Sequence, residues 1–131
     1  MISLVTTFKN EENSISVFIE SILNQSVLPD EIILVDGGST DKTIEIVEKH
    51  IIRDLRIKLI SKVANRSVCR NTGIEYAVGD IIAMTDAGCI LSKDWIKFLT
   101  APFKNDPTID VVGGYWNLKQ KTYFKKLRLC L

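Results

Sequence analysis

Short apolar runs alternate with longer segments of helical period along most of this 131-residue chain. Runs rich in Ile, Val and Leu predict strands over residues 2–7, 31–36, 57–61, 80–85 and 110–114. Apolar residues that recur every three or four positions predict helices over residues 14–25, 41–49, 67–77 and 94–100, the last ended by Pro102. Such alternation with short connections is typical of a parallel sheet that helices cover on both faces. We therefore expect a single α/β domain.

Charge and cysteine content narrow the class of protein further. The net charge is +1, which does not indicate a general polycation for nucleic acid. Residues 119–131 hold five of the 17 basic residues and no acid, so a mildly acidic body carries a short basic, apolar tail. The three cysteines are widely spaced and fit neither a disulfide framework nor a zinc-ligand pattern. With no signal peptide and no membrane-spanning stretch in the sequence, we expect a cytoplasmic protein.

Polar residues gather directly after the predicted strands. These clusters cover residues 7–12, 36–41, 64–73 and 85–89. In parallel sheets, ligands bind at the carboxyl ends of the strands, where such clusters meet along one edge. We therefore expect the four clusters to form one binding site.

Each candidate side chain also has a structural interpretation. Asp36 precedes two glycines and could be a turn aspartate, since turns favour these residue types. Arg70 could be a solvated arginine on a helix. Asp86 follows the apolar run of residues 81–84, so we expect it at the end of a buried strand, where a carboxylate needs a partner or a ligand.

Taken in order, the clusters resemble the nucleotide-binding half of family 2 glycosyltransferases, which have the GT-A fold. The resemblance rests on Asn10-Glu11, on the stretch from residue 33 to 41, on Arg70-Asn71-Thr72-Gly73-Ile74 and on the strand that runs into Asp86. Residues 111–114 resemble the next strand of the family. The resemblance implies a donor-binding domain over residues 1–116. Residues 117–131 are then the start of an acceptor-binding part, and the rest of that part is missing from this chain.

Members of this family transfer a sugar from a nucleotide diphosphate to an acceptor hydroxyl, with inversion at the anomeric carbon. By resemblance, Thr7 and Glu11 line the nucleoside pocket, and Asp36 accepts a hydrogen bond from the base, most often uracil. Arg70 closes over the base or the diphosphate. Asp86 contacts the ribose and the donor sugar and helps to hold Mg²⁺ or Mn²⁺. Carboxylate oxygens suit both cations.

Three departures from the family pattern bear on activity. Gly88 replaces the second acid of the Asp-x-Asp motif, the usual metal ligand, and Gly37 replaces the family's second aspartate after the second strand. Residues 117–131 contain no Asp, Glu or His, so the general base that inversion requires is absent there. A non-catalytic module that binds nucleotide sugars is therefore the alternative to an enzyme.

The tail has two interpretations, and two other classes of protein with the same strand–helix alternation lack support in the sequence. Residues 119–131 could begin a basic amphipathic helix that meets a membrane carrying a lipid-linked acceptor, or a helix without its packing partners. A dinucleotide-dependent oxidoreductase would need G-x-G-x-x-G after the first strand, where this chain has Thr7-Phe8-Lys9-Asn10-Glu11. A response regulator would need paired early acids and a late lysine, which the chain lacks.

Overall fold

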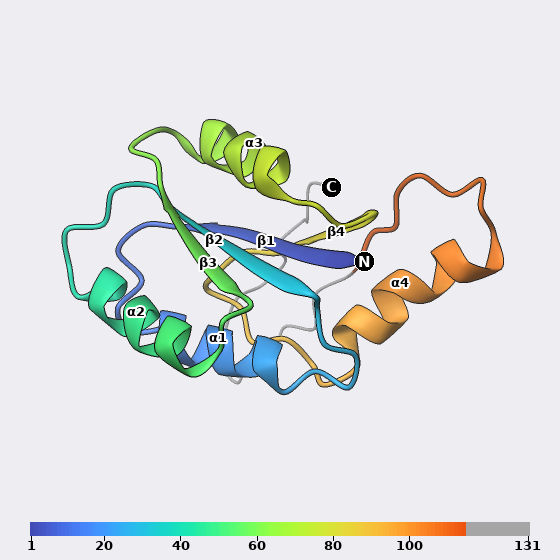
Figure 1. The fold of residues 1–131 in the computed structure, drawn as a ribbon, viewed down its shortest axis with the longest axis horizontal. Coiled ribbons are helices and arrows are strands. Elements are labelled where there is room, and N and C mark those ends of the chain that lie inside the picture. The colour runs from blue at the N-terminus through green and yellow to red at the C-terminus, as the bar shows by residue number, and fades with distance from the viewer. Residues whose placement is uncertain (115–131) are drawn as a thin grey trace, which may run out of the picture.

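The computed structural model describes residues 1–114, which form a four-stranded parallel sheet flanked by helices (Figure 1). The strand order is β3-β2-β1-β4. In chain order the elements are β1 (Ile2–Phe8), α1 (Ile15–Leu23), β2 (Glu31–Asp36), α2 (Thr43–Arg53), β3 (Ile57–Ser61), α3 (Arg66–Tyr76), β4 (Ile81–Met84) and α4 (Trp95–Asn105). The predicted α/β sheet is confirmed.

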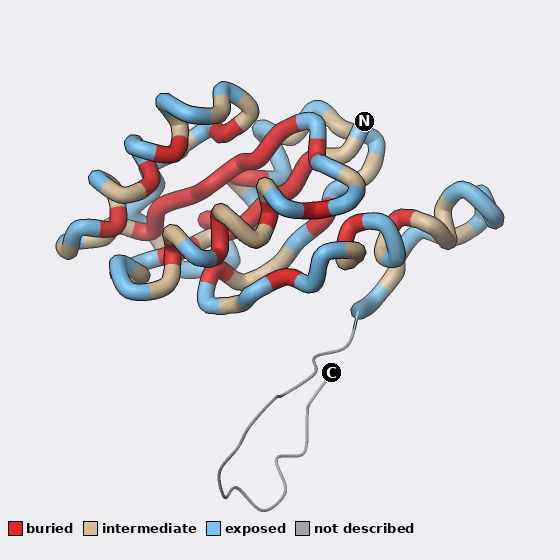
Figure 2. The backbone as a smooth tube through the Cα atoms, turned by 90° about the horizontal axis from the view of Figure 1, so that it is seen from below, coloured by how far each residue is buried: buried red, intermediate tan, exposed pale blue. Residues whose placement is uncertain are grey.

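Helices cover both faces of the sheet, as the sequence pattern predicts (Figure 1). On one face α1, α2 and α4 pack on alternate strand residues, among them Leu4, Ile32 and Leu34. On the other face α3 covers a smaller cluster built from Val5, Ile33, Val35 and Cys69. Burial is greatest along the central strands (Figure 2), and β2 is buried at every position. This explains why β2 reads as a continuous apolar run instead of an alternating one.

Gly73 allows α3 to approach the sheet closely. A Cβ atom at this position would lie 2.5 Å from Cγ1 of Val5 and 3.1 Å from Cγ2 of Val35. Real side chains do not approach so closely, so only glycine fits without a shift of the helix or the strands. The glycine of the Arg70-Asn71-Thr72-Gly73 segment therefore has a packing role, and it fixes the height of α3 above the sheet.

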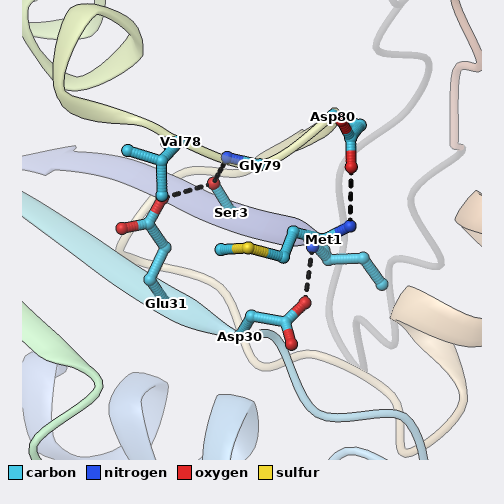
Figure 3. A network of polar contacts seen from close by, with 8 residues as sticks. Met1, Ser3, Asp30, Glu31, Val78, Gly79 and Asp80 are labelled. Carbon is cyan, nitrogen blue, oxygen red and sulfur yellow. Dashed lines mark hydrogen bonds and ion pairs between the residues drawn. The ribbon is translucent and has the colours of Figure 1, made fainter.

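At the amino end of the sheet, polar groups form a network of hydrogen bonds, part of which Figure 3 shows from close by. The carboxylate of Glu31 accepts hydrogen bonds from the Ser3 hydroxyl, the Lys58 ammonium at 2.6 Å and the Val78 amide at 2.8 Å. The Ser3 hydroxyl in turn accepts one from the Gly79 amide. Burial alone raises the pKa of Glu31, but these donors outweigh it and lower the pKa to about 2.

The chain start is joined to the same end of the sheet. The amino group of Met1 lies 2.8 Å from a carboxylate oxygen of Asp80, and the Ile2 amide donates to Asp30 at 2.7 Å. The Asp80 carboxylate raises the pKa of this amino group, and the amino group lowers that of Asp80. These contacts connect β1 to the residues that precede β2 and β4.

Two predicted elements differ from the structure. Residues 110–114 are not a strand: Val111 is 84% exposed and, within residues 1–114, this segment pairs with no strand. An apolar run does not become a strand without a neighbour to complete its hydrogen bonds. The last helix does not stop at Pro102 but continues to Asn105. Phe98, whose carbonyl loses its helical bond to the proline, is exposed, so water can satisfy it.

The prediction for the tail, residues 117–131, lies outside the described residues. None of the helices within residues 1–114 has both the length and the apolar character needed to cross a membrane.

Candidate nucleotide-sugar site

A cavity of about 520 Å³ opens at the carboxyl ends of the strands. Its lining comes from the ends of β1 and β2, the start of α3 and the segment after β4. The lining residues are Thr7, Phe8, Lys9, Glu11, Gly37, Ala64, Asn65, Arg66, Cys69, Asp86, Ala87 and Gly88. All four polar clusters predicted from the sequence therefore contribute to one site.

The loops after β1 and β2 are joined by hydrogen bonds. Asn10 has a φ of 55°. Its backbone N–H donates a hydrogen bond to the Ser39 hydroxyl at 2.9 Å, and its side-chain oxygen accepts one from the Thr40 backbone N–H at 2.8 Å. The Glu11 amide donates to the Thr43 hydroxyl at 2.8 Å, and the Glu11 carboxylate accepts the Ser14 hydroxyl. Asparagine tolerates the left-handed backbone better than most residues, which favours it at this turn. These bonds hold Glu11 at the cavity wall, and the pairing of β1 with β2 places Thr7 there.

Asp36 lies beneath the β2 loop and does not line the cavity. Its side chain is buried and accepts hydrogen bonds from the Ser39 amide at 2.9 Å, the Ser39 hydroxyl at 2.6 Å and the Gly38 amide at 3.1 Å. Gly38 has a φ of 95°, which favours glycine. Asp36 therefore closes the turn that brings Gly37 to the cavity wall, and its contact with a base stays a prediction.

Arg70 and Asp86 meet at the rim of the cavity. Nη2 of Arg70 donates to Oδ1 of Asp86 at 2.8 Å, and the two side chains are 42% and 48% exposed. Arg70 does not itself line the cavity but reaches it through this contact. Asp86 does have a partner, Arg70, but the expectation of a buried strand end, which was the reason to expect one, is wrong. Within residues 1–114, β4 lies at the edge of the sheet, and Ala83 is its one buried residue, so water reaches Asp86.

Four further lining residues were not predicted individually. Lys9 and Arg66 are exposed cations, and within residues 1–114 neither forms an ion pair. Asn65 caps α3, because its side chain accepts the Val68 amide at 3.0 Å. Cys69 is buried, and its thiol donates to the Lys62 carbonyl at 3.2 Å. Their positions in the sequence could have indicated that both line the site, because Lys9 directly follows a strand and Arg66 is the first residue of a helix.

The segment after β4 also carries the thiol of Cys89. Burial and the nearby Asp86 carboxylate raise the pKa of this thiol, so it is neutral at physiological pH. Its backbone amide donates to the Asp86 carbonyl at 3.3 Å. Cys89 thus supports the turn that carries Asp86.

The donor set at Asp86 fits a divalent cation only together with other ligands. Within the described residues, no group of three or more His, Cys, Asp or Glu side chains could hold a metal ion. Asp86 supplies one carboxylate, and Gly88 supplies no side chain. Mg²⁺ and similar cations do bind through one carboxylate when phosphate oxygens and water complete the shell. The site therefore fits a cation that arrives with a diphosphate.

The sequence matches the family model described as "Glycosyl transferase family 2" over residues 3–130. An uncharacterized glycosyltransferase of Haemophilus influenzae is 40% identical over 99 residues, which are 74% of this chain and 40% of that protein. The chain thus spans less than half the length of this relative.

Solved structures with the same fold carry nucleotides. S. aureus TarS in complex with UDP has a TM-score of 0.69 and 26% identity, covering 79% of this chain and 32% of that one. The mannosyltransferase PcManGT from Pyrobaculum calidifontis, in complex with GDP-Man and Mn²⁺, has a TM-score of 0.72 and 23% identity, covering 82% and 33%. The sheet and its helices on both faces are those of GT-A glycosyltransferases.

Proposed function

Because this chain belongs to glycosyl transferase family 2, we propose that it binds the donor in an inverting glycosyltransferase. The enzyme transfers a sugar from a nucleotide-diphosphate sugar to an acceptor hydroxyl, in the synthesis of a polysaccharide, a glycolipid or another envelope component. Residues 1–116 form the donor-binding domain. Residues 117–131 begin the part that contributes to acceptor binding.

The observation that carries this proposal is the Arg70–Asp86 pair at the rim of the cavity. A diphosphate needs positive charge, and the planar guanidinium of Arg70 can donate two parallel hydrogen bonds to it. Thr7 and Glu11 lie on the β1 side of the cavity, where they contact the nucleoside. Asp36 holds the loop through which Gly37 faces the same space, and its hydrogen bond from the base remains part of this proposal.

We propose a UDP-linked donor. TarS, at 26% identity, has been solved with UDP and with UDP-GlcNAc, which supports uridine over other bases. The fold also accepts a guanosine donor, since PcManGT carries GDP-Man. GDP is therefore the comparison that any binding experiment must include.

Mg²⁺ or Mn²⁺ is the proposed cofactor, held by Asp86 together with the diphosphate. When bound, the cation neutralises charge on the departing diphosphate. The presence of Mn²⁺ in PcManGT supports this assignment for the fold. Gly88 contributes no carboxylate, so Asp86 is the one acidic side chain that this turn offers.

The general base comes from outside residues 117–131, which contain no Asp, Glu or His. The second candidate function, a nucleotide-sugar-binding module without chemistry, follows from the same observation. Sugar transfer or donor hydrolysis by the purified 131-residue chain separates the two.

The basic, apolar tail at residues 119–131 is proposed to meet the cytoplasmic face of a membrane, where a lipid-linked acceptor would lie.

Thermal unfolding with UDP, GDP or dTDP, each with Mn²⁺, Mg²⁺ or EDTA, tests the proposal. A nucleotide at 100 times its dissociation constant stabilises a protein by about 2.7 kcal/mol, which raises the melting temperature by several degrees. We expect the largest rise with UDP and Mn²⁺, and about half of that rise in Asp86→Asn, because tenfold weaker binding leaves about 1.4 kcal/mol of stabilisation. Glu48→Gln, on the exposed side of α2, is the matched control. A cooperative transition that no nucleotide shifts would refute donor binding.

A further inference from the structure

Asp86 and Arg70 satisfy each other before any ligand arrives. Among the charged side chains that line the cavity within residues 1–114, Asp86 alone is in an ion pair, at 2.8 Å from Arg70. The backbone carbonyl of Thr85, the residue before Asp86, accepts a hydrogen bond from the Thr6 hydroxyl at 2.7 Å. The backbone at Asp86 is therefore tied to β1, while Arg70 has a long side chain that can move.

The two groups that a nucleotide diphosphate with its cation would need are thus engaged with each other. A diphosphate needs the guanidinium, and a divalent cation needs the carboxylate. The Asp86 carboxylate also repels any phosphate beside it. Ion pairs as exposed as this one are weak, whereas bidentate bonds between arginine and phosphate are among the stronger hydrogen bonds. The pair is therefore one that a ligand can open.

We propose that Asp86 is an internal competitor for Arg70, and that Arg70 turns to the diphosphate when a divalent cation takes the carboxylate. This inference rests on the proposed function and adds a coupling to it. Without a cation, Asp86 weakens nucleotide binding. With a cation, the same residue strengthens it. Asp86 therefore has effects of opposite sign in the two conditions.

Calorimetric titration of UDP into the 131-residue chain tests the coupling, with binding itself as the readout. The proteins are the wild type, Asp86→Asn, Arg70→Gln and the double variant, each measured in EDTA and in Mn²⁺. In EDTA we expect Asp86→Asn to bind UDP about three- to tenfold more tightly than the wild type. In Mn²⁺ we expect it to bind about tenfold more weakly.

The double variant is the matched control for general charge effects. Removal of the Asp86 charge reduces repulsion of UDP whether or not Arg70 is present. If Asp86 acts through Arg70, adding Asp86→Asn to the Arg70→Gln protein changes affinity in EDTA by less than about twofold. Thermal unfolding of each variant verifies that it is folded.

The outcomes separate the inference from the proposed function. If UDP binds but Asp86→Asn does not tighten binding in EDTA, the competition is refuted and donor binding stands. The same holds if the gain is undiminished in the Arg70→Gln background. If folded wild-type chain binds neither UDP nor GDP in either condition, the proposed function fails and the inference fails with it.

Discussion

The amino end and the carboxyl end of this one sheet both carry acidic side chains beside cationic ones, yet the two ends are built differently. At the amino end, Glu31 is 4% exposed and accepts hydrogen bonds from three donors. At the carboxyl end, Asp86 is about half exposed and, within residues 1–114, its side chain accepts one hydrogen bond, from Arg70.

This difference separates groups that hold the fold from groups that are free to bind. A buried carboxylate with several donors stabilises the folded chain, because its removal leaves those donors unsatisfied. An exposed ion pair contributes little to stability and exchanges readily for another partner. Charge alone therefore does not identify a binding site in this domain, whereas burial together with the number of partners does.

Glu31→Gln should produce the largest loss of stability. The folded pKa of Glu31 is about 2 and its ordinary value is 4.5, so the ionised side chain contributes about 3 kcal/mol at pH 7. The pKa is lowered on folding, so this contribution is present above pH 4.5 and is lost as the pH falls toward 2. Urea unfolding at several pH values measures it.

The pH dependence of the stability difference is the result that could contradict this prediction. The stability difference between wild type and Glu31→Gln should shrink as the pH falls below 4.5. The exposed acid Glu48, changed to Gln, controls for loss of a charge. A difference that stays constant from pH 7 to 3 would mean that the amide disturbs packing and that the carboxylate charge is not what stabilises this end.

Asp36→Asn should have an intermediate effect, because Asp36 lies at the carboxyl end but is built like Glu31. It is buried and its carboxylate accepts bonds from Ser39 and Gly38. An asparagine keeps one acceptor oxygen, so we expect a loss of about 1 kcal/mol, measured by urea unfolding. UDP affinity should fall by less than about threefold if the base does not contact Asp36. A tenfold loss at unchanged stability would instead support the contact with the base.

The sequence predicted the sheet well because its strands are defined by local pattern. Residues 31–36 and 57–61 form strands with the predicted bounds, and the strand-end clusters do converge. The predicted strand at 110–114 is wrong: within residues 1–114 this segment pairs with no strand, and local pattern does not encode a partner. The sequence predicts a helix end at Pro102, but α4 continues to Asn105, since the proline removes a single bond at a turn where Phe98 is exposed.

The candidate site was harder to predict, since its chemistry depends on which groups face one another. Sequence alone placed Thr7, Glu11 and Asp86 at the cavity, where the structure has them. It could not distinguish Asp36 beneath the loop from a side chain in the cavity, because both follow from the same position after β2. Nor could it reveal the Arg70–Asp86 contact, which joins residues 16 positions apart.

Arg70→Gln should have the smallest effect on stability and therefore tests the comparison most sharply. The pair is exposed, so we expect the free energy of unfolding to change by less than about 1 kcal/mol. UDP affinity in Mn²⁺ should nevertheless fall about tenfold, because a charge-assisted bond to phosphate is lost. Lys49→Gln, which removes an exposed cation on α2 away from the cavity, controls for the change in net charge. If Arg70→Gln destabilised the chain as much as Glu31→Gln, the Arg70–Asp86 pair would stabilise the fold as Glu31 does. The contrast between the two ends of the sheet would then be wrong.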